Sequence, residues 1–148
     1  MKIGPYLRNR IVLCSLDATP RAQKTDYCEA GYFFPGGKWV GTMRNAARRL
    51  GCRFVILTGK YGMVNPDDVI GPFDVPSIDE NVKQIWEQTI PKLIGNSQYN
   101  AILIYFGANP RDNIIETILP ILGSLNIRLI TFGKPNMCDV GKIDEVVK

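Results

Sequence analysis

The sequence contains no histidine. Histidine is the side chain whose ordinary pKa lies nearest to neutral pH, and its imidazole is a usual ligand of catalytic zinc. Any general acid or base in this chain therefore has to be Asp, Glu, Lys, Tyr or Cys. We accordingly predict a protein that works without a bound metal and without another cofactor.

Long apolar runs, cysteine pairs and nucleotide-binding signatures are missing as well. The longest apolar run, at residues 101–107, has the length of a strand rather than the ~20 residues of a membrane span. The four cysteines form no C-x-x-C pair, so a structural zinc site and a thioredoxin-like motif lack support. No apolar stretch follows Met1 that could act as a secretory signal. These absences predict a cytoplasmic protein with reduced thiols and no membrane partner.

What remains is the composition of an ordinary globular domain. The 148 residues are 45% hydrophobic and 22% charged, which fits one packed domain over residues 1–148. The 18 basic residues outnumber the 14 acidic ones and give a net charge of +4. This charge permits a polyanionic partner such as a nucleic acid but does not require one.

Four apolar segments of strand length alternate with segments of helical periodicity. We expect the strands at residues 10–15, 53–58, 101–106 and 128–132. The expected helices are 38–50, one opened by a Ser77 and Glu80 capping box, one from Asn109 to about Leu122, and a short one at 142–147. The segments 21–37 and 59–72 are expected to be long loops. This alternation predicts an α/β domain with three α/β/α layers around a mainly parallel sheet of four to five strands.

Small, polar or charged side chains follow each predicted strand, and open parallel sheets bind ligands beyond the carboxyl ends of their strands. We therefore expect the ligand-binding residues at these exits. They are Cys14, Ser15, Thr58, Gly59, Tyr61, Gly62, Gly107, Asn109 and Arg111. Residues 107–111 also begin a helix, whose free backbone N–H groups favour a phosphate or carboxylate. The alternatives are a helix cap that binds nothing and, at 58–62, a plain turn. A Walker-type phosphate loop and the glycine-rich dinucleotide fingerprint are absent, which argues against a nucleotide-driven motor and a dehydrogenase.

The expected helix at 38–50 is rich in basic residues. Arg44 and Arg48 lie largely off its apolar stripe, and Lys38 begins it. These three side chains are candidate contacts to a nucleic-acid backbone, and the aromatic residues of the preceding loop are candidates for stacking on bases. The alternative is that the arginines form a solvated helix face.

One block of the chain resembles a known family. Residues 54–74, FVILTGKYGMVNPDDVIGPFD, resemble the ILSAKYGLL-x-P-type block of an uncharacterised α/β family, which is similar in this block to the peroxide-stress protein YaaA. The Cys14-Ser15 pair, Gly107 and residues 140–142 resemble further parts of that family's pattern. The resemblance implies a connection with nucleic acid or nucleobases, since YaaA-like proteins are associated with DNA protection and binding. It implies no particular reaction.

These observations lead to one main hypothesis about function and two alternatives. The main hypothesis is a nucleotide- or nucleic-acid-associated protein that acts on a nucleobase or an N-glycosidic bond, as a hydrolase or transferase without a metal. Its candidate catalytic residues are Asp17, Lys60 and Asp74. Lys60 and Ser15 would hold phosphate, Tyr61 would stack on a base, and a carboxylate (Asp17, Asp67 or Asp74) would orient the base or act as general base. The alternatives are a non-catalytic DNA- or RNA-binding module and a thiol-dependent enzyme with Cys14 as nucleophile.

Overall fold

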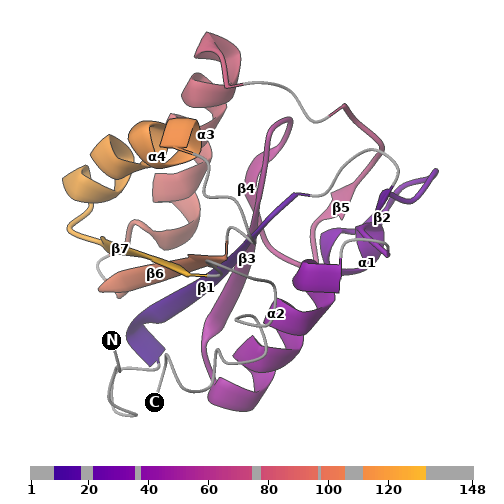
Figure 1. The fold of residues 1–148 in the computed structure, drawn as a ribbon, viewed down its shortest axis with the longest axis horizontal. Coiled ribbons are helices and arrows are strands. Elements are labelled where there is room, and N and C mark those ends of the chain that lie inside the picture. Colours follow the sequence, from indigo (N-terminus) through magenta and orange to yellow (C-terminus); the bar gives the residue numbers. More distant parts are fainter. Residues whose placement is uncertain are drawn as a thin grey trace.

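Five strands form one sheet in the order β4-β3-β1-β6-β7 (Figure 1). The computed structural model describes residues 9–17, 22–35, 38–74, 78–96, 98–105 and 112–132. The strands of the sheet are β1 (Ile11–Leu16), β3 (Arg53–Thr58), β4 (Gly62–Val64), β6 (Ala101–Tyr105) and β7 (Arg128–Phe132). β1 pairs in parallel with β3 and β6, β6 pairs in parallel with β7, and only β4 is antiparallel to its neighbour within this sheet. The predicted α/β class and mainly parallel sheet are confirmed.

The central strands are apolar throughout because both of their faces are covered. On β1, Ile11 and Leu13 face the cluster formed with α2 (Lys38–Leu50), and Val12 and Cys14 face the cluster formed with α3 and α4. α3 spans Glu80–Ile94 and α4 spans Asp112–Ser124. Figure 1 shows α2 on one side of the sheet and the α3–α4 pair on the other. No helix in the described ranges is long and apolar enough to cross a membrane.

Both segments that we expected to be loops contain regular structure. The first holds β2 (Cys28–Glu29) and α1 (Ala30–Phe33), and the second holds β4 and β5 (Val69–Ile70). β2 and β5 pair antiparallel as a small second sheet. The expectation was wrong because these elements are only two to four residues long, too short for a periodic sequence signal.

The start of α3 also differs from expectation. We expected Ser77 to cap this helix, but the N-cap is Asp79, whose side chain accepts a hydrogen bond of 3.0 Å from Val82 N. The Asp79 carboxylate thus satisfies one of the free N–H groups of the first turn and also lies favourably at the positive end of the helix. Pro91 lies inside the helix, which continues to Ile94.

This cap gives a simple test of the helix start. Asp79→Ala removes the acceptor of the Val82 N–H group and should lower the free energy of unfolding by about 1 kcal/mol. Asp79→Asn keeps a side-chain oxygen at the same place and should cost only a few tenths of that. Urea denaturation of the three proteins provides the measurement, and equal losses in both variants would show that the cap does not stabilise the helix.

Candidate functional site

The topology places the switch point of the sheet between β1 and β6. The chain leaves β1 for α2 on one face and leaves β6 for α4 on the other, and ligands of such sheets bind where these connections diverge. Asp17 follows β1 directly. Three predicted ligand residues follow β6 and lie outside the described residues: Gly107, Asn109 and Arg111. The side chain of Lys38 lies outside them as well.

Asp17 links the exits of two neighbouring strands. Its Oδ2 atom accepts a hydrogen bond of 2.9 Å from Gly59 N, and its own N–H donates to Leu57 O at 3.1 Å. The side chain is half-buried. Asp17 is thus at the edge where we expected it, and one of its carboxylate oxygens holds the turn that follows β3.

The turn that follows β3 is closed by its own side chains. The Thr58 hydroxyl donates to Gly62 O at 3.0 Å and accepts from Tyr61 N at 2.9 Å, and Thr58 is fully buried. Thr58 O accepts from the indole N–H of Trp86 at 3.0 Å. Thr58 and Gly62, predicted as ligand residues, instead connect the sheet to α3.

Tyr61, which we predicted to stack on a base, is half-buried and packs against the aromatic part of the core. It meets Phe73 edge-on, with 5.7 Å between ring centroids, and its hydroxyl accepts a hydrogen bond of 3.2 Å from Gly71 N. Lys60 is exposed, with its Nζ atom 5.4 Å from the centroid of the Tyr61 ring. Tyr61 thus packs on Phe73, which belongs to a buried aromatic cluster with Phe33 and Phe34, and its stacking on a base stays a prediction.

Cys14 and Ser15 are buried rather than exposed at the end of β1. Cys14 is 0% exposed and packs in the cluster under α3 and α4, and Ser15 is 1% exposed with its hydroxyl donating to Leu16 O at 3.2 Å. Burial raises the pKa of the Cys14 thiol from 9.0 to about 12. A thiol nucleophile has to be accessible and partly ionised near neutral pH, so this geometry contradicts both a ligand-contact role and a nucleophilic role for Cys14.

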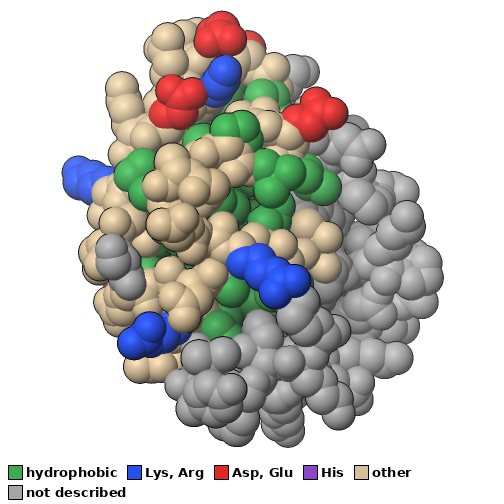
Figure 2. Space-filling model, turned by 90° about the vertical axis from the view of Figure 1, so that its left-hand side faces the viewer, with side chains coloured by type: hydrophobic (Ala, Val, Ile, Leu, Met, Phe, Trp, Pro, Cys, Tyr) green, Lys and Arg blue, Asp and Glu red, His purple; other side chains and the backbone are tan. Residues whose placement is uncertain are grey.

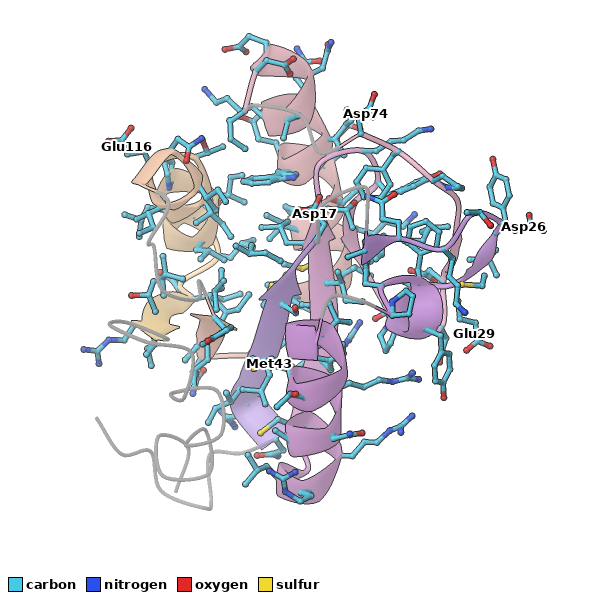
Figure 3. All side chains as sticks on the ribbon, turned by 45° about the vertical axis from the view of Figure 1, so that its right-hand side comes forward. Asp17, Asp26, Glu29, Met43, Asp74 and Glu116 are labelled. Atoms are coloured by element: carbon cyan, nitrogen blue, oxygen red, sulfur yellow. The ribbon has the colours of Figure 1, made fainter. Side chains whose placement is uncertain are left out.

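A groove of about 480 Å³ lies beside Phe73. We call it the edge groove; it is lined by Gln23, Lys24, Thr25, Pro72, Phe73 and Asp74. Its two walls are joined because Phe73 N donates to Gln23 Oε1 at 3.1 Å. Lys24, Thr25 and Asp74 are exposed. Figure 3 shows Asp17 and Asp74 toward the same end of the molecule.

Sequence reasoning named Asp74 as a candidate catalytic residue, but it did not name Gln23 or Thr25, which line the groove with it. The available signal was the unusual length of the segment between the first two predicted strands, because long connections in compact domains are often functional. Lys60, the predicted catalytic cation, is not among the residues that line the groove.

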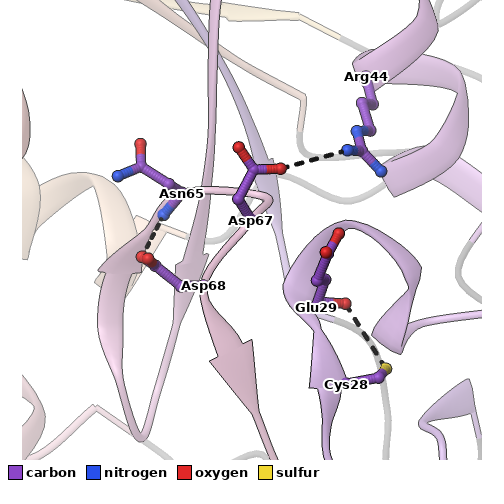
Figure 4. A network of polar contacts seen from close by, with 6 residues as sticks. All are labelled: Cys28, Glu29, Arg44, Asn65, Asp67 and Asp68. Carbon is purple, nitrogen blue, oxygen red and sulfur yellow. Dashed lines mark hydrogen bonds and ion pairs between the residues drawn. The ribbon is translucent and has the colours of Figure 1, made fainter.

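Arg44 is buried, contrary to its expected place on a solvated helix face. It is 8% exposed, with its guanidinium carbon 4.5 Å from the centroid of the Tyr32 ring and its Nη2 atom 3.8 Å from Asp67 Oδ1 (Figure 4). Arg48 is exposed. The expectation failed because α1 and the Pro66–Asp67 turn cover this part of α2, and neither was foreseen. Within the described ranges, no group of three or more acidic or cysteine side chains is placed to hold a metal ion.

Comparison with known proteins adds no assignment. No family model matches the chain, and no curated protein or solved structure shows significant similarity to it. The likeness of the 54–74 block to YaaA-like proteins therefore stays a prediction from the sequence.

Gly62 provides a test of the turn. Its φ is +72°, and a Cβ at this position would collide with Thr89 Oγ1 and lie 2.8 Å from Ile85 Cγ2. Gly62→Ala should therefore lower the free energy of unfolding by about 2 kcal/mol or more. The control is Gly41→Ala, an exposed α2 position with no neighbour within 4 Å, which should raise stability by about 0.5–1 kcal/mol. Chemical denaturation measures both, and a neutral Gly62→Ala would contradict the tight packing on α3.

The buried thiol predicts a pH dependence of stability. The folded protein holds the Cys14 proton up to a pKa of about 12, whereas the unfolded thiol ionises near 9.0, so the unfolded state binds fewer protons between these values. Stability should therefore fall as the pH rises from about 9 to about 12. Cys14→Ala costs packing at every pH but removes this titration, so its free energy of unfolding should fall less steeply over the same range. Parallel slopes would contradict the burial of the thiol.

Proposed function

We propose that the protein binds a nucleotide-class ligand in the edge groove. The observation that carries this proposal is the grouping of Lys24, Asp74 and an amide and a hydroxyl side chain on the two walls of one groove. A cation suits a phosphate, a carboxylate suits sugar hydroxyls or a base N–H group, and the apolar Pro72 and Phe73 edges suit a ring. The YaaA-like block supports the same ligand class, because it supplies one wall of the groove.

The size of the groove supports a whole small molecule rather than a single ion. Ligand pockets generally measure about 300–1,000 Å³, and the edge groove measures about 480 Å³. The Gln23–Phe73 hydrogen bond fixes the spacing of the two walls before a ligand arrives. A preformed site of this kind loses less entropy on binding.

A reaction on the bound ligand would depend on Asp74. It is the carboxylate that lines the groove and is exposed to it, whereas Asp17 is half-buried and hydrogen-bonded to Gly59 N. An aspartate can position water or stabilise positive charge that develops on a sugar when an N-glycosidic bond breaks. Action on such a bond is therefore the chemistry that we assign to this site, with Lys24 binding phosphate.

The alternative of a nucleic-acid-binding module has less support. Arg44 is mostly buried, so it does not lie on an exposed helix face that could follow a phosphate backbone over several nucleotides. On the side with α4 and β7, which Figure 2 shows, the described Lys and Arg side chains lie singly. A backbone-tracking surface needs several aligned cations.

The proposal can be tested by thermal-shift measurements with nucleosides and nucleoside 5′-monophosphates. A ligand at about 100 times its Kd should add about 2.7 kcal/mol of stability, which is roughly 5–10 °C. Lys24→Gln should remove most of the additional shift that the phosphate gives over the nucleoside alone. Asp74→Asn should reduce the shift of both ligand types, because its contacts are to sugar or base.

Two matched variants control for net charge. Lys83→Gln changes an exposed lysine on α3 and Asp26→Asn changes an exposed aspartate outside the groove, so both should keep the full ligand-induced shift. Loss of the shift in either control to the same degree would indicate a diffuse charge effect. Absence of any shift with the wild-type protein would overturn the proposal.

A further inference from the structure

The buried guanidinium of Arg44 belongs to a second, separate depression. The depression measures about 210 Å³, and we call it the Arg44 pocket; the residues that define it here are Arg44, Arg48, Cys52, Phe54, Pro66 and Asp67. Cys52 and Phe54 lie just before and at the start of β3, whereas the edge groove lies beyond the turn at its other end. The two sites share no lining residue.

The backbone of α1 leaves space for the guanidinium of this arginine. A Cβ at position 31 would collide with Arg44 Nη1 and lie 2.7 Å from Cζ, so only a glycine leaves room for the guanidinium. The Tyr32 ring covers the same group at 4.5 Å. The Gly31 N–H group donates to Pro66 O at 2.8 Å and fixes the turn on the other side. The arginine is therefore held in a defined position within the structure.

The charge of Arg44 is poorly matched within the described part of the chain. Its nearest carboxylate oxygen, Asp67 Oδ1, is 3.8 Å from Nη2, beyond hydrogen-bond distance, and the Asp67 side chain is 83% exposed. Nη1 is buried and has no hydrogen-bond partner among the residues that the structure describes. Buried cations are normally paired and hydrogen-bonded because an uncompensated charge inside a protein is costly. An additional anion beside Arg44 would supply the missing compensation.

A second cation lines the same pocket. Arg48 follows Arg44 by one helical turn, a spacing that brings two side chains to the same face of α2. Two guanidinium groups at one small pocket favour a phosphate, whose oxygens accept several charge-assisted hydrogen bonds. The volume of 210 Å³ lies below that of pockets that enclose a drug-sized ligand and suits a single phosphate group.

We propose that the Arg44 pocket is a phosphate-binding site in which Arg44 and Arg48 hold the anion and Asp67 competes with it. In the structure Asp67 occupies the position of a weak counter-ion (Figure 4). Because Asp67 lies on an exposed turn and makes no hydrogen bond to Arg44, a phosphate can displace it. The pocket recognises the phosphate group alone, which can belong to a free phosphomonoester or to a phosphodiester of nucleic acid.

The test is an NMR titration of the full-length ¹⁵N-labelled protein with inorganic phosphate at constant ionic strength. Saturable shifts are expected at the amides of residues 44–48 and 67. Arg48→Gln should weaken phosphate binding about tenfold without changing the thermal midpoint, because two charge-assisted hydrogen bonds are lost from an exposed side chain. Asp67→Asn should strengthen binding severalfold by removing the competing carboxylate.

The matched control is Arg49→Gln, which removes the same charge from a neighbouring exposed position that does not line the pocket. It should change the affinity by less than about twofold. Equal losses in the Arg48 and Arg49 variants, weaker binding by Asp67→Asn, or the absence of saturable shifts would each overturn the proposal. Lys24→Gln should leave this titration unchanged, so failure here is distinguishable from failure of the edge groove.

Two further titrations identify the source of the phosphate. Glycerol phosphate is the probe for a phosphomonoester, and a short oligonucleotide without terminal phosphates is the probe for a phosphodiester. Arg48-dependent shifts with glycerol phosphate alone assign the pocket to a small phosphorylated molecule. Arg48-dependent shifts with the oligonucleotide assign it to a nucleic-acid backbone, with an affinity that falls as salt increases.

Discussion

The turn that reverses β3 into β4 is the point at which both faces of the sheet are joined. Thr58 closes the turn through its hydroxyl and, through its carbonyl, accepts the Trp86 indole N–H on the α3 side. Tyr61 extends from the same turn to the opposite side and packs on Phe73. Asp17 ties the turn to the exit of β1. A few hydrogen bonds within five residues therefore position one wall of the edge groove relative to the parallel sheet.

Much of the fold follows from burial alone. The strands at 53–58 and 128–132 are found as expected, because strands buried on both faces are continuous apolar runs. The strand expected at 10–15 is shifted by one residue to Ile11–Leu16, and the one expected at 101–106 is found over Ala101–Tyr105, with residue 106 outside the described residues. The short elements β2, β4 and β5 could not be predicted in this way. β2 and β5 are far apart in sequence, β4 pairs with the neighbouring β3, and none of them is long enough to show a period.

The candidate site was less predictable than the fold, and for a related reason. Asp17 and Asp74 could be placed near the carboxyl edge from strand order, but the use of a side chain depends on neighbours that strand order does not give. The sequence suggests Tyr61 as a residue that stacks on a base. In the structure its ring packs on Phe73 and its hydroxyl accepts a hydrogen bond from Gly71 N. The position of Arg44 on its helix predicts a solvated side chain. In the structure this side chain is buried because α1 covers it.

The small sheet of β2 and β5 has a consequence for how the molecule opens. Together with α1 it is connected to neighbouring described segments by backbone hydrogen bonds such as Gly31 N to Pro66 O and Lys24 N to Phe33 O. Its strands pair across a long sequence separation, so the loop-closure cost delays their pairing during folding. Such a unit opens by local unfolding at a lower free energy than the central sheet. Tyr32 belongs to α1, so opening of this unit would separate Tyr32 from Arg44 and uncover the guanidinium of the proposed phosphate site.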